Sequence, residues 1–139
     1  KPDISLTGQV TIKAPHAAGF KVTNLVSTVE GANWVEASRV DAPTEDAQSD
    51  YISFSFVGLQ GDSARNFAWQ AGKEQVVFTF QNAGGCVDGV ALMANQDPFN
   101  VEKNSANTNP GNQFTNLGWG AVSENHYTGN YGESIKCKR

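Results

Sequence analysis

Alternating hydrophobic and polar residues dominate this chain and predict β-strands. The clearest case is 51–59, where Ile52, Phe54 and Phe56 face one way and serine and tyrosine residues face the other. The same period-2 pattern, rich in β-branched and aromatic residues, recurs in segments 8–15, 19–31, 34–40, 74–82 and 86–94, the last interrupted by Gly89. Gly, Pro, Asn and Asp separate these segments, and none keeps a helical period. The pattern predicts an all-β, antiparallel two-sheet β-sandwich.

The segment 95–116 breaks the alternation. It holds seven asparagines and two prolines. Asparagine folds its side chain onto nearby backbone and tolerates left-handed conformations, so we expect a long Asn/Gly-rich loop or, as the alternative, a pair of short strands with long turns. Phe99 and Phe114 are expected to pin this loop to the body of the domain. After it, 117–123 and 133–137 are predicted as closing strands.

Length and charge narrow the class of protein. The 139 residues suit one domain, 1–139, which is large enough to bury a core. A net charge of −4 argues against a nucleic-acid partner, which calls for a basic patch. No apolar run approaches the roughly 18 residues of a membrane helix, so we expect no membrane insertion.

The chain has two cysteines, Cys86 and Cys137. They are either two free thiols or a disulfide. We favour the disulfide, because Cys137 stands in a polar, charged tail where an exposed free thiol is a liability in a secreted protein. A disulfide places the domain in an oxidising compartment, so the expected location is secreted, at the extracellular cell surface.

Three segments carry a resemblance to a known family. QVTIKAP (9–15), YISFSFVGL (51–59) and AGKEQVVFTFQN (71–82) resemble the strands of cohesin-like and carbohydrate-binding-module-like β-sandwiches. The second half, from NAGGCVDGVALM (82–93) to the terminal cysteine, is similar to modules in secreted surface proteins of gliding Gram-negative bacteria. The resemblance implies a cohesin-like or immunoglobulin-like sandwich. The cysteine pair and the Asn-rich loop depart from true cohesins, so dockerin binding is not carried over.

Catalytic motifs are missing from the sequence. No serine lies in a G-x-S-x-G motif. No sequence pattern pairs two carboxylates to face each other across a cleft, as a glycosidase requires. We therefore predict that the protein is not an enzyme.

The sequence offers two candidate ligand sites, one for Ca²⁺ and one for carbohydrate. Asp97, Asn95 and Asn100 offer oxygen ligands for Ca²⁺, the only cofactor that the sequence suggests. The alternative is a structural cluster of Asx turns. The acidic loop 41–50 lacks the EF-hand pattern and is expected to be solvated.

Aromatic residues near Gly- and Asn-rich turns are the candidates for sugar stacking. Trp119, Tyr127 and Tyr131 are the expected carbohydrate-binding residues, with turn packing as the alternative. Trp34 lies in a strand pattern and is expected in the core.

The leading functional hypothesis is a structural or adhesive module of a bacterial surface protein or fibre. Its partners would be other copies of itself or neighbouring surface modules. The N-terminal strand could add to the sheet edge of a neighbour, or be an ordinary edge strand of its own domain. The alternatives are a module that binds polysaccharide and a calcium-stabilised adhesin domain.

Overall fold

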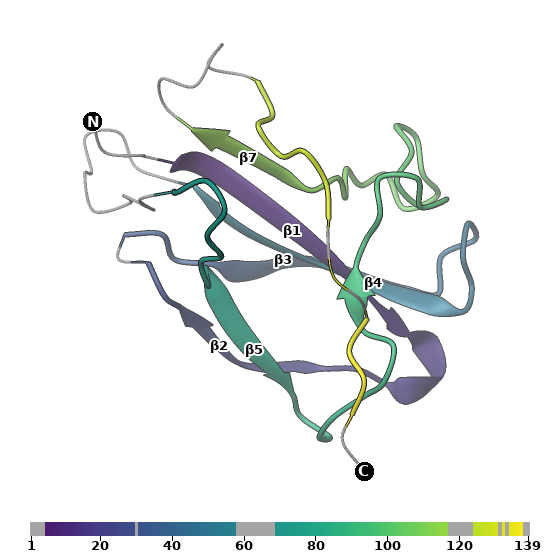
Figure 1. The fold of residues 1–139 in the computed structure, drawn as a ribbon. Helices are drawn as coiled ribbons and strands as arrows, with labels where there is room; N and C mark the ends of the chain where they lie inside the picture. Colours follow the sequence, from purple (N-terminus) through teal and green to yellow (C-terminus); the bar gives the residue numbers. More distant parts are fainter. Residues whose placement is uncertain are drawn as a thin grey trace.

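The fold is described from a computed structural model, in residues 5–29, 31–57, 69–116, 124–130, 132 and 134–137. They form β1 (Ser5–Pro15), the short 3-10 helix η1 (His16–Ala18), β2 (Val22–Ser27), β3 (Val35–Asp41), β4 (Ser49–Val57), β5 (Phe78–Asn82), β6 (Ala91–Leu92) and β7 (Gln113–Asn116). All pairings between these strands are antiparallel and build two sheets (Figure 1). The all-β sandwich prediction is confirmed. In this described part of the chain, no helix is long and apolar enough to cross a membrane.

β1 is the central strand of the larger sheet. One of its edges pairs with β4, which in turn pairs with β3. Its other edge pairs with β7 near the start and with β6 further along. Gly8, for example, lies opposite Phe56 on one side and Phe114 on the other. Residues 5–15 are therefore neither an edge strand nor free to pair with a neighbouring molecule while the domain is folded.

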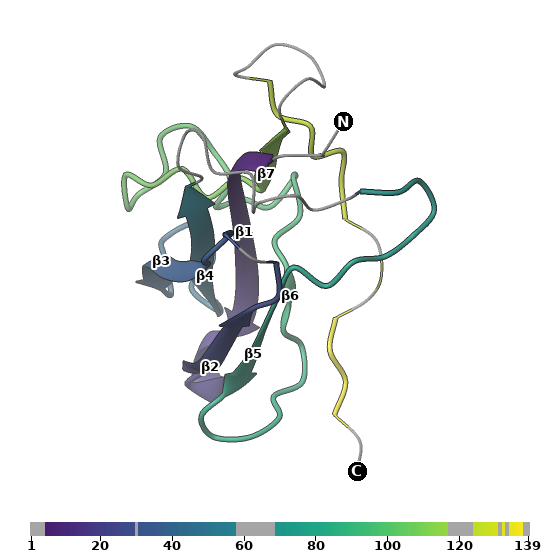
Figure 2. The ribbon, with the colours of Figure 1, turned by 90° about the vertical axis from the view of Figure 1, so that its left-hand side faces the viewer.

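The core lies between this sheet and the smaller sheet of β2 and β5 (Figure 2). The side chains of Ile52, Phe54 and Phe56 are buried in it, as their alternation predicts. The Phe54 ring stacks on Phe80 of the opposite sheet, with ring centroids 5.1 Å apart. Trp34 is 4% exposed and joins the same core, which confirms its predicted place.

The outer face of the larger sheet is also covered. Tyr51 points away from the core, yet it is 2% exposed because Phe99 stacks on its ring at 4.5 Å between centroids. Met93 completes this second apolar cluster. The Asn-rich loop thus forms a third layer over the sheet, and Phe99 pins it there as predicted.

Several strand boundaries differ from the predicted ones. The strand predicted over 74–82 begins only at Phe78, and Val76 before it is 61% exposed. The sequence predicts the segment 86–94 as a strand interrupted at Gly89. The interruption is confirmed by a φ of 89° at Gly89, but only Ala91–Leu92 form a regular strand, β6. The segment 134–137 is not a regular strand, and the one predicted over 117–123 lies outside the described residues.

The two ends of the described chain lie far apart. In both ribbon views β1 starts near the top of the molecule, whereas the yellow C-terminal segment runs to the bottom (Figures 1 and 2). A pull on the two ends would therefore act along the length of the sandwich.

Candidate functional site

An asparagine side chain completes the larger sheet where β6 and β7 leave a gap beside β1. The backbone N–H of Thr11 donates to Asn112 Oδ1 at 2.7 Å. Asn112 Nδ2 donates to the Met93 carbonyl at 2.9 Å, and the Met93 N–H donates to the Thr11 carbonyl at 2.8 Å. Thr11 and Asn112 are both buried, so one amide group satisfies backbone groups that solvent cannot reach.

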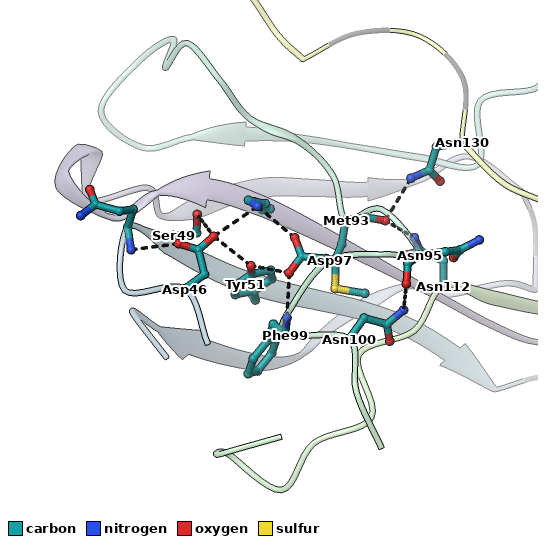
Figure 3. A network of polar contacts seen from close by, with 12 residues as sticks. Asp46, Ser49, Tyr51, Met93, Asn95, Asp97, Phe99, Asn100, Asn112 and Asn130 are labelled. Carbon is teal, nitrogen blue, oxygen red and sulfur yellow. Dashed lines mark hydrogen bonds and ion pairs between the residues drawn. The ribbon is translucent and has the colours of Figure 1, made fainter. Parts of the chain in front are cut away.

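A polar network joins the Asn-rich loop to β1 and β4 (Figure 3). Asp97 is its centre. The Tyr51 hydroxyl donates to Asp97 Oδ1 at 2.7 Å, and the Phe99 N–H donates to the same oxygen at 2.9 Å. Lys13 Nζ lies 2.9 Å from Asp97 Oδ2 and 3.2 Å from Asp46 Oδ2. The Asp97 side chain is 3% exposed, so these contacts replace water around its carboxylate.

The network changes the acidity of its members. Burial and the Asp97 carboxylate raise the pKa of Tyr51 well above its ordinary value of 10.0, so this phenol stays a donor. Burial alone would lower the pKa of Lys13, but hydrogen bonds to Asp97 and Asp46 outweigh it and raise the pKa above 10.5. Burial alone would raise the pKa of Asp46. Hydrogen bonds from Ser49 and the neighbouring backbone, with the Lys13 cation, instead hold it below 3.8.

The residues predicted to bind calcium come together in a turn. The Asn100 N–H donates to the Asp97 carbonyl at 2.9 Å, and Asn100 Nδ2 donates to the Asn95 carbonyl at 3.1 Å. The side chain of Lys13 brings a positive charge to the Asp97 carboxylate. The described residues contain no group of three His, Cys, Asp or Glu side chains arranged for a metal ion. Calcium binding stays a prediction.

The acidic loop 41–50 is attached to the Asn-rich loop, although it was expected to be solvated. The Ser105 hydroxyl and backbone N–H each donate to the Glu45 carboxylate at 2.6 Å. The Ser105 hydroxyl bond holds the pKa of the half-buried Glu45 below its ordinary value. With the Lys13–Asp46 ion pair, this bond fixes the acidic loop beside the third layer.

Cys86 and Cys137 form a disulfide with their Cα atoms 5.9 Å apart, as predicted. Hydrogen bonds reinforce the link on both sides. The Cys137 N–H donates to Asp88 Oδ1 at 2.6 Å. Ile135 exchanges backbone bonds with Gly89 and Val90, at 2.9 and 2.8 Å. We call this arrangement, residues 86–90 with 134–137, the C-terminal clasp.

A groove with aromatic walls opens at the side of the sandwich. Two adjoining hollows, of about 330 and 460 Å³, share Trp69, Phe114 and Tyr127. The first reaches the core between the sheets at Phe78 and Phe80, and the second is lined further by polar residues, Gln70, His126 and Thr128. The rings of Trp69 and Phe114 meet edge to face, 5.8 Å apart.

Of the predicted sugar-binding residues, Tyr127 lines this aromatic groove, whereas Trp119 and Tyr131 lie outside the described residues. Burial raises the pKa of the Tyr127 hydroxyl, and the side chain of Asn112 opposes this rise in part. Trp69 also lines the groove. It is one of the aromatic residues near a glycine turn, but it is not among the expected carbohydrate-binding residues.

Comparisons with known proteins give no match: no protein-family model, no curated protein and no solved structure is significantly similar to the chain. The resemblance to cohesin-like and carbohydrate-binding modules therefore stays a prediction.

Proposed function

We propose that this chain is a non-enzymatic structural module of an extracellular surface protein or fibre, which carries load between neighbouring modules or copies. The C-terminal clasp is the observation that supports the proposal. Because Cys137 is bonded to Cys86, a pull on the C-terminal end enters the fold next to β5. The Asn-rich loop and β7 lie between the two cysteines and are bypassed by this force.

Two other features support a load-bearing role. The start of β1 and the C-terminal segment lie at opposite ends of the molecule (Figure 2). β1 itself is held by hydrogen bonds along both edges, so extracting it requires breaking two ladders together. The disulfide also fits an oxidising, extracellular setting.

Single-molecule pulling tests this function. The chain is held at both ends and stretched, with a Cys86→Ser/Cys137→Ser variant as the control. Wild type should resist higher force than the variant. Its unfolding extension should also be shorter by roughly 160–180 Å, because the disulfide withholds a sequence separation of 51 residues from stretching. Equal unfolding forces in the two proteins would refute a load-bearing clasp.

A carbohydrate-binding role is the second candidate, supported by the aromatic groove. Sugar rings would stack on Trp69 or Tyr127, with hydroxyls bonded by the polar lining. Affinity electrophoresis against a panel of polysaccharides tests it. Retardation that is lost in Tyr127→Ala and kept in Val35→Ala, an exposed position on β3, would support this function. Unretarded migration through every polysaccharide would exclude it for that panel.

A further inference from the structure

Lys13 and Asp97 form an ion pair that has a second carboxylate beside it. The amine and the carboxylate come from positions 84 residues apart and meet at 2.9 Å, with the carboxylate almost completely buried. A second carboxylate, Asp46, contacts the same amine at 3.2 Å. The rings of Tyr51 and Phe99 stack beside them. An amine, a buried carboxyl group and a second carboxylate are therefore held within reach of one another.

The two oxygens of Asp97 are in different environments (Figure 3). Oδ1 accepts hydrogen bonds from the Tyr51 hydroxyl and the Phe99 N–H, at 2.7 and 2.9 Å. Two fixed donors on one oxygen stabilise the negative charge that builds up there when a nucleophile attacks the carboxyl carbon. Oδ2 instead faces Lys13 and is the oxygen placed to leave.

We propose that Lys13 and Asp97 join covalently, in an intramolecular isopeptide bond that the protein forms on itself. Lys13 first passes one proton to Asp97, which gives a neutral amine and a carboxylic acid. Nζ of Lys13 then attacks Cγ of Asp97. Asp46 takes a second proton from the nitrogen and delivers it to Oδ2, which departs as water. One C–N bond forms, one C–O bond breaks, and no oxidant or reductant is needed.

The bond would tie the central strand of the sheet directly to the third layer. A plain ion pair between β1 and the Asn-rich loop can separate and re-form, whereas an amide there would make the attachment permanent. The proposal is separate from the load-bearing role, because the cross-link is read from the mass of the protein at rest and does not depend on force.

Intact mass spectrometry of the purified full chain is the test. The expected mass is that of the disulfide-bonded chain less one water. Proteolysis should then release a branched peptide that joins Lys13 to Asp97. Lys13→Arg and Asp97→Ala should restore the missing water. Asp46→Asn should leave the chain unlinked, whereas Asp41→Asn, a carboxylate paired with Arg39 away from this network, should keep the cross-link.

Two results would overturn the proposal. A wild-type mass with no loss beyond the disulfide hydrogens would show that Lys13 and Asp97 are only an ion pair. A water loss that maps to other residues, or that persists in Lys13→Arg, would place the chemistry elsewhere. Full cross-linking in Asp46→Asn would remove Asp46 from the mechanism.

Discussion

Gly8 makes room for Trp34 in the core. A Cβ atom at Gly8 would lie 3.0 Å from Cη2 of Trp34 and 2.6 Å from Cε1 of Phe56. The Trp34 ring packs against Phe56, Phe78 and Phe114, with centroids 4.8, 4.6 and 5.8 Å away. The missing side chain on the central strand therefore lets an indole fit between the two sheets.

Gly8→Ala is expected to destabilise the fold by roughly 1–3 kcal/mol, because the added methyl forces packed rings to move. Urea unfolding followed by tryptophan fluorescence measures this change. Gly84→Ala is the matched control, since a Cβ there meets its nearest neighbour, Asn82, at an ordinary 3.5 Å. Equal stability of the two variants would contradict this view of Gly8.

Asn112→Ala is expected to leave the Thr11 N–H without its acceptor and to remove one hydrogen-bond donor from the Met93 carbonyl. Each buried group left unsatisfied costs about 1–3 kcal/mol. Chemical denaturation measures the loss, and hydrogen exchange should show faster exchange at Thr11. The exposed Asn109 serves as the control, because Asn109→Ala keeps the backbone carbonyl that Gln9 uses. Unchanged exchange at Thr11 would mean that the Asn112 side chain does not take the place of a backbone hydrogen bond in the sheet.

The pH dependence of stability follows from the Lys13 network. The pKa of Asp46 is lowered in the folded state, so its contribution is present above pH 3.8 and is lost as the pH falls through the folded value. In the chain without the Lys13–Asp97 cross-link, the pKa of Lys13 is raised, so its contribution is present below pH 10.5 and is lost as the pH rises through the folded value.

In the chain without the cross-link, the unfolding free energy should therefore fall at both extremes. Lys13→Met should remove only part of the alkaline limb, because Tyr51, whose pKa is also raised, contributes to the loss of stability at high pH. Urea titrations at a series of pH values provide the measurement. An alkaline limb that is just as steep in Lys13→Met would show that other groups cause it.

Reduction of the C-terminal clasp is expected to lower stability by roughly 4 kcal/mol, the chain-entropy value for a closed loop of this length. The melting temperature of wild type with and without reductant gives the result. Cys86→Ser/Cys137→Ser is the control, because reductant should not affect it. A wild-type melting point that reductant leaves unchanged would contradict the clasp.

Chelation tests the predicted calcium site. We expect the melting temperature to be the same with excess Ca²⁺ and with chelator, because Lys13 neutralises Asp97 either as its ion-pair partner or in the proposed amide. A rise in melting temperature with Ca²⁺ that disappears in Asp97→Ala would instead support a calcium-stabilised adhesin domain.

The sequence determined β1, β3 and β4 of the larger sheet and the residues that face its core, whereas β7 lies in the segment 95–116 that was expected to be mainly loop. Alternation at Ile52, Phe54 and Phe56 is a local property with one physical cause, burial of one face, so it could be read directly. The cysteine pair and the role of Phe99 were also predictable. The exposure of Val76 was not predictable. The alternating pattern continues through this residue, but the backbone before β5 is irregular and leaves its side chain exposed.

Only the tertiary structure decided what covers the other face of that sheet. Tyr51 and Thr11 stand at polar positions of their strands, yet both are buried, because a loop from later in the chain covers them. The contact between Lys13 and Asp97 arises in the same way, across 84 residues of sequence. Local periodicity shows that a side chain leaves the core. It carries no information on which distant segment that side chain then meets, since packing and hydrogen bonding across the whole fold settle that.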